Sequence, residues 1–383
     1  MNKNYIKFSK PLHGHSEKKA LIKVMNSGWL TTGKETTLFE KNFNKYKKSK
    51  YALALNSCTA ALHLSLLLLN LKKNDEVITS ALTFSSTINS IVMSGAKPVL
   101  ADVSLKDQNI DPDDIEKKIT KKTKAILIVH FAGRPCEMDK IMKIIKKYNL
   151  KLIEDCAHSI ESKYKRKHLG TFGTFGCFSF YATKNLSIGE GGMLITSNKK
   201  LYEKARILSL HGMDKAAWNR YGKQGYRHYD VSQIGYKYNL MDLLAVIGVM
   251  QLKKINQNHK KRKNIWDLYS KKFKNQSFKT PGTFDSKIIH HGYHLFNIFL
   301  NKRRDGISRD EAITLLHKKK IGVGIHYRSI PEHSIYKKKY NWNVNNYPNA
   351  KKIGRETLSL PLSPSLNKNE ILKVINVIKK ITN

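Results

Sequence analysis

Residues 51–62 read YALALNSCTAAL, and this stretch contains the strand, the turn and the helix start on which the predicted fold rests. Tyr51–Leu55 is a short apolar run typical of a buried strand, and small polar residues then lead into an apolar helix. The alternation continues to about residue 197, with strand-like runs at Tyr51–Leu55, Glu76–Ile78, Pro98–Val103, Ala125–His130, Leu152–Asp155, Cys177–Phe180 and Gly192–Thr196. Strands that alternate with helices predict an α/β fold with a mostly parallel sheet covered on both faces.

The helices between these runs and the pattern that follows them complete the prediction. Asp111 is placed to cap a helix whose first residue is Pro112. A long helical pattern includes Trp266–Phe273, and it is followed by a strand-like run, Tyr293–Leu300, and helical patterns at Arg309–Lys319 and Asn367–Ile381. A chain of 383 residues is longer than one core usually supports. We therefore predict a large domain with an N-terminal segment, residues 1–256, and a smaller α+β domain, residues 257–383.

The charge is the most unusual bulk property, since 70 Lys and Arg against 29 Asp and Glu give a net charge of +41. Such a charge is typical of nucleic-acid binding. The lysines are dispersed in small groups, however, and no nucleic-acid-binding motif accompanies them, so a solvated lysine surface is the preferred interpretation. A positive field would still speed the encounter with an anionic substrate.

Cysteine spacing and hydropathy indicate the compartment. Cys58, Cys136, Cys156 and Cys177 are widely and irregularly spaced, which suggests neither a disulfide framework nor a metal site. No apolar stretch approaches the roughly 20 residues of a membrane span. The N-terminus carries lysines with no apolar segment behind them, so no signal peptide is expected. These features predict a cytoplasmic protein without a membrane segment.

Ligands in open α/β sheets bind at the carboxyl ends of the strands, so the residues that follow the strand runs are the candidates for a site. After Tyr51–Leu55, the helix start near Thr59 offers backbone N–H groups and a hydroxyl that suit a phosphate, although Ser57 or Thr59 would serve equally as a helix cap. Asp155 ends another strand, and a buried carboxylate there requires a cation or a donor. A protonated pyridine nitrogen would satisfy it; the alternative is a cap on the next turn.

Two further strand ends carry a lysine and an aromatic ring. Lys184 closely follows an apolar strand and precedes the glycine-rich residues 189–192, where desolvation would lower its pKa and free it for Schiff-base chemistry. A surface position is the alternative that applies to most lysines of this chain. Phe84 follows Glu76–Ile78 and would stack on a flat ring, or pack in the core.

Blocks of sequence along nearly the whole chain resemble the sugar-nucleotide aminotransferases of the DegT/DnrJ/StrS type. Among them are NSCTAALHLSL, VHFAGRPCEMD, IEDCAHSI, FSFYATKNLSIGEGGMLIT and GYKYNLMDLLAVIGVMQL. Members of that family are pyridoxal-phosphate enzymes with the aspartate aminotransferase fold (fold type I). The resemblance therefore implies this fold and pyridoxal 5'-phosphate as the cofactor.

The resemblance also implies roles for individual residues. Lys184 would form the Schiff base with the cofactor, Asp155 would pair with the pyridinium nitrogen, and His158 would lie beside the phenolic oxygen of the ring. Phosphate contacts would come from Ser179, Thr59 and the backbone of Cys58, and Phe84 would stack on the ring. Some relatives carry His in place of the lysine and act as dehydratases, and Lys184 argues against that outcome.

One block departs from the usual sequence of the family. Where many members have Gly-Tyr-Asn-Tyr-Arg-Met, with the Asn reaching the phosphate of the neighbouring subunit's cofactor, this chain has Lys237 at the Asn position. Lys237 would meet a phosphate as a point charge, or is a surface lysine. The variant is similar to that of enzymes that aminate C4 of UDP-linked 4-keto sugars. His326 and Tyr327 resemble a family segment near the sugar-nucleotide site.

The function implied is a ping-pong transfer of an amino group from L-glutamate to a nucleotide-linked keto sugar, with a 4-keto sugar favoured. The resemblance further implies a homodimer with active sites at the subunit interface. Two alternatives stay open: an aminotransferase for a keto-cyclitol, and an inactive scaffold that binds nucleic acid or regulates, which the high charge motivates. The intact set of Lys184, Asp155 and Ser179 speaks against the second alternative.

Overall fold

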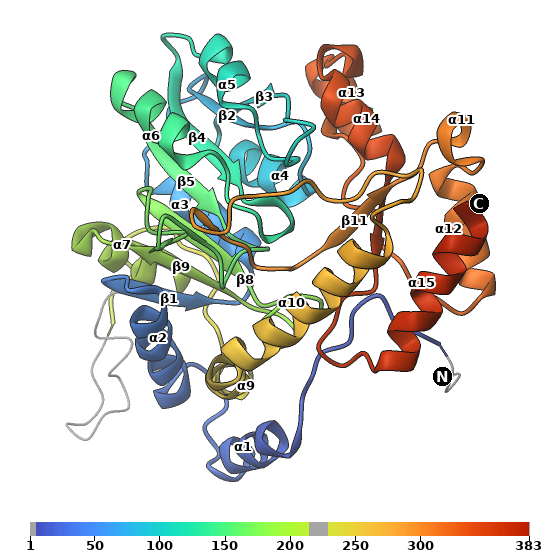
Figure 1. The fold of residues 1–383 in the computed structure, drawn as a ribbon. Helices are drawn as coiled ribbons and strands as arrows, with labels where there is room; N and C mark the ends of the chain where they lie inside the picture. The colour runs from blue at the N-terminus through green and yellow to red at the C-terminus, as the bar shows by residue number, and fades with distance from the viewer. Residues whose placement is uncertain (1–4, 214–228, 383) are drawn as a thin grey trace.

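A seven-stranded sheet forms the centre of the molecule, for which a computed structural model describes residues 5–213 and 229–382 (Figure 1). The strand order is β1-β9-β8-β5-β4-β2-β3. Only β9 runs against its neighbours in this sheet, so the predicted mostly parallel arrangement is confirmed. The strands are β1 (Tyr51–Leu55), β2 (Glu76–Ser80), β3 (Lys97–Ala101), β4 (Thr123–Val129), β5 (Lys151–Asp155), β8 (Phe175–Ser179) and β9 (Gly192–Thr196).

Helices cover both faces of this sheet because successive strand residues point to opposite sides. Leu152 of β5 belongs to the apolar cluster under α2, α6 and α9, whereas the next residue, Ile153, belongs to the cluster under α3, α4 and α7. Asp111 caps α5 and Pro112 is its first residue, as predicted. The helices of this region are α1 (His15–Asn26), α2 (Lys34–Lys47), α3 (Cys58–Leu67), α4 (Ser85–Met93), α5 (Pro112–Lys118), α6 (Met138–Lys147), α7 (Lys199–Ser209) and α9 (Asp242–Lys253).

A second apolar core forms around an antiparallel pair, β11 (Phe296–Phe299) and β12 (Thr357–Leu360). Phe296 and Ile298 of β11 and Leu358 of β12 are fully buried there against α10 (Ile255–Lys272), α12 (Arg309–Lys318) and α15 (Lys368–Thr382). Shorter elements are α11 (Lys302–Asp305), α13 (Ser334–Tyr340), α14 (Pro348–Glu356), β6 (Lys163–Tyr164), β7 (Lys167–His168) and β10 (Ile289–His290). Since α10 continues α9 with only Lys254 between them, the boundary at residue 256 stays a prediction.

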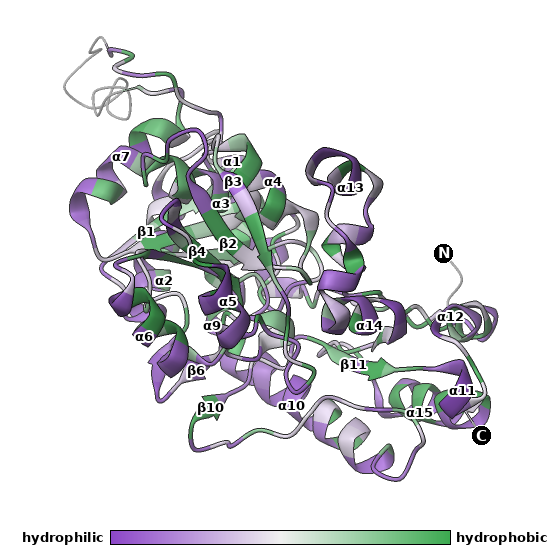
Figure 2. Cartoon of the chain, turned by 90° about the horizontal axis from the view of Figure 1, so that it is seen from above, coloured by the Kyte–Doolittle hydropathy of each residue, from purple (hydrophilic) through white to green (hydrophobic). Residues whose placement is uncertain are grey.

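The N-terminal segment before α1 contacts both cores. Ile6 pairs with Ile321 and belongs to the second core, while the Ser9 hydroxyl donates to the carbonyl of Thr183, 3.3 Å away, next to Lys184. Hydrophilic residues dominate the outer surface of helices such as α10 and α13 (Figure 2), as the dispersed lysines predict. None of the helices in the described ranges combines the length and the apolar composition that crossing a membrane requires.

Candidate active site

A cradle for an anion forms where β1 gives way to α3. Ser57 caps the helix, since its Oγ accepts the N–H of Ala60 at 3.1 Å, so the capping interpretation of Ser57 is confirmed. The N–H groups of Cys58 and Thr59 fall in the first turn, where a helix provides no acceptor, and they are available to an anion. Gly192 of β9 permits this turn to come close, because a Cβ there would lie 2.4 Å from the carbonyl of Ser57.

Ser179 lies beside this cradle. It is the residue of β8 paired with Gly192, and its Oγ accepts the N–H of Tyr181 at 3.3 Å, which leaves the hydroxyl proton free to donate. The predicted phosphate contacts Cys58, Thr59 and Ser179 are therefore brought together by three different elements, α3, β8 and β9.

Asp155 ends β5 with its side chain only 4% exposed. One carboxylate oxygen accepts the N–H of Ala157 at 3.0 Å and the other the hydroxyl of Thr87 at 3.3 Å. Burial raises the pKa of Asp155, opposed by these bonds and by the positive charge of Lys184. The bond to Ala157 is the capping contact considered from the sequence, but it does not offset the burial. The carboxylate therefore still favours a cationic partner.

Lys184 lies in the loop that joins β8 to β9, where its backbone N–H donates to the carbonyl of Tyr181 at 2.9 Å. Burial lowers the pKa of Lys184 to about 8, opposed by the negative charge of Asp155. A lysine with such a pKa is partly a neutral amine at physiological pH and can act as a nucleophile. Lys184 is thus not a surface lysine.

His158 is held between a backbone amide and a phenol. Its Nδ1 accepts the N–H of Ala132 at 3.2 Å, and its Nε2 lies 3.0 Å from the hydroxyl of Tyr327. Burial and the charge of Lys184 lower the pKa of His158 well below its ordinary value, so the ring is neutral. Since Nδ1 accepts, the single proton is on Nε2, which donates to Tyr327. The Tyr327 hydroxyl therefore keeps its own proton for another acceptor.

Phe84 and His326 both lie beside the ring of Tyr327. The ring centroid of Phe84 is 5.8 Å from that of Tyr327, and Phe84 is 57% exposed, so it does not pack in the core as the alternative proposed. Nδ1 of His326 shares a hydrogen bond of 2.8 Å with the hydroxyl of Ser359. The His326 ring stacks on Phe8, with ring centroids 5.4 Å apart. The structure thus places both resembled residues, His326 and Tyr327, next to His158.

Lys237 lies near the cradle through its backbone, but its side chain contacts other residues. Its side chain is exposed and donates to the side-chain oxygen of Asn239, and its carbonyl accepts the side-chain N–H of Asn56 at 3.1 Å. Among the described residues, no contact joins the Lys237 side chain to Lys184, Asp155 or His158.

A polar network behind Lys184 was not predicted from the sequence. Asn185, the next residue, donates from Nδ2 to both carboxylate oxygens of Glu161, at 2.9 and 3.1 Å. Its Oδ1 lies 2.9 Å from Nδ1 of His294, whose ring centroid is 4.3 Å from that of His158. Thr87, which donates to Asp155, was also missed. The only signal for Asn185 was its position after Lys184, because the partners lie far apart in the chain.

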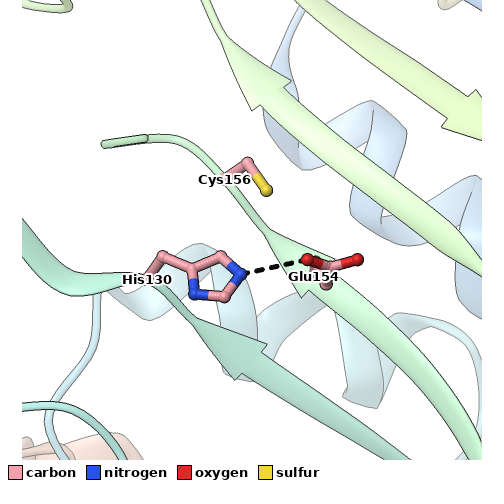
Figure 3. A group of neighbouring side chains, drawn as sticks. All are labelled: His130, Glu154 and Cys156. Atoms are coloured by element: carbon pink, nitrogen blue, oxygen red, sulfur yellow. Dashed lines mark hydrogen bonds and ion pairs between the residues drawn. The ribbon is translucent and has the colours of Figure 1, made fainter. Parts of the chain in front are cut away.

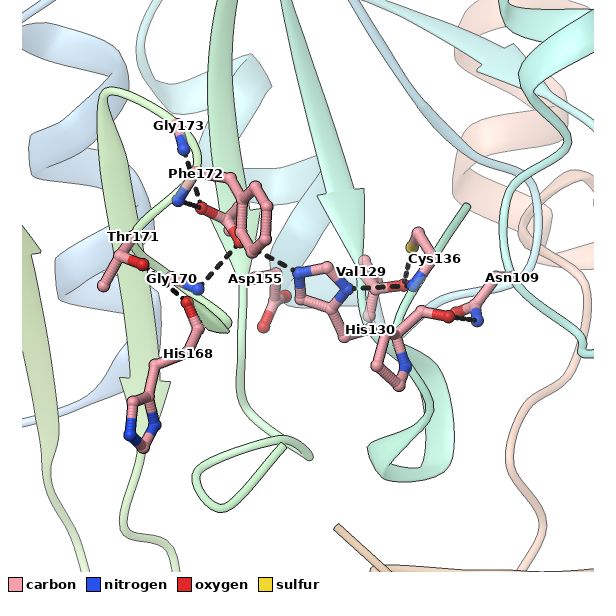
Figure 4. A network of polar contacts seen from close by, with 12 residues as sticks. Asn109, Val129, His130, Cys136, Asp155, His168, Gly170, Thr171, Phe172 and Gly173 are labelled. Atoms are coloured by element: carbon pink, nitrogen blue, oxygen red, sulfur yellow. Dashed lines mark hydrogen bonds and ion pairs between the residues drawn. The ribbon is translucent and has the colours of Figure 1, made fainter. Parts of the chain in front are cut away.

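A buried group on the other face of β5 has a structural explanation. His130, Glu154 and Cys156 place potential metal-ligand atoms within 4.8 Å of one another (Figure 3). Glu154 already accepts from His130 Nε2 at 3.2 Å and from the backbone N–H groups of Gly170, Phe172 and Gly173 at 2.7 Å. Figure 4 labels these four donor residues, and its dashed lines mark the bonds. These bonds use the oxygens a metal would need, and they fix the loop before β8. The four cysteines of the chain carry free thiols.

The chemistry of the donors indicates what the site can hold. A phosphate suits the N–H groups at the cradle, a ring nitrogen that carries a proton suits Asp155, and a carbonyl carbon suits the amine of Lys184. Pyridoxal phosphate carries all three groups on one flat ring, and the exposed face of Phe84 suits that ring. The residues present therefore fit this cofactor.

Comparisons with known proteins support the same conclusion. Residues 11–379 match the model of the DegT/DnrJ/EryC1/StrS aminotransferase family. The spore coat polysaccharide biosynthesis protein SpsC of Bacillus subtilis is 41% identical, over 99% of this chain and 97% of SpsC. The structure of PseC from Helicobacter pylori, an aminotransferase involved in the biosynthesis of pseudoaminic acid, has a TM-score of 0.90 at 29% identity and covers 99% of each chain.

Spr1654 of Streptococcus pneumoniae, which is provisionally named a sugar aminotransferase, has been solved in its PMP and PLP forms. Its PMP form has a TM-score of 0.92 at 30% identity, covering 98% of this chain and 99% of that one. Its PLP form has a TM-score of 0.91 at 29% identity, covering 99% of this chain and 98% of that one. This chain therefore belongs to the DegT/DnrJ/EryC1/StrS aminotransferase family and is a pyridoxal-phosphate-dependent sugar aminotransferase.

Proposed function

We propose that this enzyme transfers an amino group from L-glutamate to a nucleotide-linked keto sugar, with a 4-keto sugar as the favoured acceptor. The observation that carries the proposal is the partly buried Lys184, with a pKa lowered to about 8, in a sugar aminotransferase scaffold. The similarity to SpsC and PseC, both named for saccharide biosynthesis, supports a sugar acceptor. The excess of positive charge supports an acceptor that carries phosphates.

The roles of the residues follow from their positions. Pyridoxal phosphate, when bound, supplies a ring that withdraws electrons and retains the amino group between the two half-reactions. Asp155 would hold the proton on the ring nitrogen, and the amine of Lys184 would take and return a proton at the substrate carbon that bears nitrogen. His158 would lie beside the phenolic oxygen.

The remaining contacts position the cofactor and substrate. Thr59, Ser179 and the backbone of Cys58 would hold the phosphate, and Phe84 would cover the ring. Tyr327 and His326 would face the sugar nucleotide, where the free proton of the Tyr327 hydroxyl provides a donor.

A homodimer would complete this site. Phe84 is 57% exposed and Ile234 91% exposed in the single chain, which is unusual for large apolar side chains and supports a covering subunit. The Lys237 side chain contacts none of Lys184, Asp155 and His158 among the described residues of its own chain. It would instead reach the cofactor phosphate of the neighbouring subunit. The free thiols of the four cysteines support action in the reducing cytoplasm.

The proposal is tested by loading the enzyme with pyridoxamine phosphate and adding UDP-, GDP- and dTDP-linked 4-keto and 3-keto sugars. A true acceptor restores the absorbance of the lysine-bound cofactor at about 410–430 nm. The Lys184→Ala enzyme is the control and shows no such band. If the enzyme turns over a keto-cyclitol that carries no nucleotide, and turns over none of the nucleotide sugars, the cyclitol alternative replaces the proposal. A separate titration with L-glutamate tests the donor.

A further inference from the structure

An open cavity of about 790 Å³ lies on a part of the molecule that the active site does not use. It is bounded by α2, the β6–β7 hairpin, β10 and the segment where α9 leads into α10, and Figure 2 shows β6, β10 and α10 close together on one side. We call it the histidine cavity, because three of the chain's 15 histidines line it. The side chains that matter are Lys45, Lys163, Lys253, His168, His259 and His290.

The cavity is positively charged. Lys45, Lys163 and Lys253 line it against one carboxylate, Glu161. Both oxygens of Glu161 are already bonded to Asn185, and burial raises the pKa of Glu161, which reduces its negative charge. Burial, and after it the charges of lysines 47 and 163, lowers the pKa of His168 to about 3, so this ring is neutral.

The histidines add directional hydrogen-bonding groups. His168 is only 6% exposed, and its Nδ1 has no hydrogen-bond partner within the described part of the chain. An unpaired buried polar group costs about 1–3 kcal/mol, which a ligand would recover once the ring turns to expose this nitrogen. His259 donates from Nε2 to the carbonyl of His291 at 2.8 Å and stacks on His290 with ring centroids 4.7 Å apart, so the Nδ1 of the neutral ring is an acceptor.

A second cavity of the same molecule shows that volume and lysines alone do not make this arrangement. It has a volume of about 830 Å³ and is lined by Lys121, Lys124 and Lys151, but by no histidine and by none of the unpaired buried groups. Given the charge of +41, any groove of this protein will contain lysines. The clustered histidines and the unpaired Nδ1 distinguish the histidine cavity.

We propose that the histidine cavity binds a phosphate-bearing small molecule at a site separate from the active site. Its volume is that of a pocket for a ligand of nucleotide size, since such pockets occupy about 300–1,000 Å³. Lysine ammonium groups supply the charge and donate to phosphate oxygens, and Nδ1 of His259 offers an acceptor to a hydroxyl of the ligand. The inference rests on the cavity alone and does not depend on the proposed acceptor.

The cavity also has a physical connection to the catalytic lysine. Glu161 lies in its wall and holds Asn185, whose backbone follows Lys184 directly, and Asn185 in turn bonds His294 at 2.9 Å. A ligand that displaces the Glu161 side chain would disturb this bond. Occupancy of the cavity would thereby act on the position of Lys184.

The experiment is a calorimetric titration of the holoenzyme with inorganic pyrophosphate. The test variant is Lys163→Gln with Lys253→Gln, and the matched control is Lys121→Gln with Lys124→Gln, which removes the same charge from the cavity without histidines. We expect a binding event in the wild-type and control proteins that is weakened at least 10-fold in the test variant. All four lysines are partly or fully exposed, so folding is not at risk, and thermal melting verifies it.

Two results would overturn the proposal. One is the absence of pyrophosphate binding by the wild-type holoenzyme at millimolar concentration. The other is equal affinity in the test and control variants, which would assign any binding to the active site or to the general positive field.

Discussion

The backbone N–H of Ala132 lies 3.2 Å from Nδ1 of His158, and this bond determines what Tyr327 can do. With Nδ1 occupied as an acceptor, neutral His158 carries its proton on Nε2 and donates it to the Tyr327 oxygen 3.0 Å away. Burial raises the pKa of Tyr327, so the phenol stays protonated. The turn at residues 131–133 therefore sets the direction of a chain of hydrogen bonds that ends with a donor in the site.

Replacing Tyr327 with Phe removes this donor and keeps the ring. If the hydroxyl binds the reacting substrate, kcat/KM falls about 5- to 30-fold, the loss expected for a hydrogen bond of 1–2 kcal/mol. Tyr269→Phe is the control, since its hydroxyl donates to the carbonyl of Pro361 at 2.9 Å in the second core. That variant should lose thermal stability but keep its kcat/KM. Equal kcat/KM in wild type and Tyr327→Phe would show that the phenol proton has no acceptor.

Lys184→Ala removes the amine that, in the proposed function, would carry the cofactor and move the proton. We expect the variant to retain cofactor through the phosphate cradle and Asp155, but to lose transamination by several orders of magnitude. Single-turnover kinetics and the absorbance of the bound cofactor measure the two effects separately. Lys199→Ala, on the exposed start of α7, is the control. Near wild-type turnover of Lys184→Ala, with amine rescue excluded, would contradict the assignment.

Asp155→Asn keeps the shape of the side chain and removes its charge. Without the carboxylate, the proton on the ring nitrogen is less well held, so kcat should fall far more than cofactor occupancy. Thr87→Val, which removes one donor to Asp155, should have a much smaller effect in the same direction. A normal kcat in Asp155→Asn would leave Asp155 with only its bond to Ala157, as a cap.

The pH dependence of cofactor uptake tests the pKa of Lys184. Burial holds it at about 8, below the ordinary 10.5, so the reactive neutral amine is gained as the pH rises through 8. In the cofactor-free protein, the rate of Schiff-base formation should rise about tenfold per pH unit below 8 and level off above it. A free lysine amide, measured alongside, corrects for titration of the cofactor itself. A rate that keeps rising beyond pH 9.5 would mean that the pKa is not lowered.

Lys237→Ala separates a local contact from the general field. As one of many positive charges it contributes little at long range, whereas a direct phosphate contact is worth roughly 1.5–3 kcal/mol. Weaker cofactor retention is expected if Lys237 reaches across the dimer, and a raised KM if it meets the sugar nucleotide. If both stay unchanged, Lys237 is a surface residue and the support for a 4-keto sugar weakens.

The elements that the sequence predicted well are those whose signal is local. All seven strands of the central sheet were predicted, because each is a short apolar run closed by polar or small residues. The ends were less accurate: the predicted strand at Tyr293–Leu300 is only Phe296–Phe299 in the structure, since Tyr293 has the left-handed φ of 47°. The pair β6–β7 and strand β12 were missed, because two- and four-residue strands have no periodicity to detect.

The site divides in the same way. Lys184, Asp155 and Ser179 could be selected as candidates because each lies at or shortly after the end of a strand, where a parallel sheet collects its ligands. The contacts of Glu161, Asn185 and His294 join residues 24 and 109 positions apart, and no local pattern carries that information. The tautomer of His158 likewise depends on a backbone amide 26 positions away.

The pairing of β1 with β9 has a consequence for how the enzyme is made. Leu55 lies opposite Gly192, so the phosphate cradle needs both strands. During synthesis β1 leaves the ribosome before β2, β3, β4, β5 and β8, and its partner follows all of them. A nascent chain that ends before Gly192 has no closed cradle and cannot hold the cofactor. We therefore expect pyridoxal phosphate to bind late, to a polypeptide whose sheet is already complete.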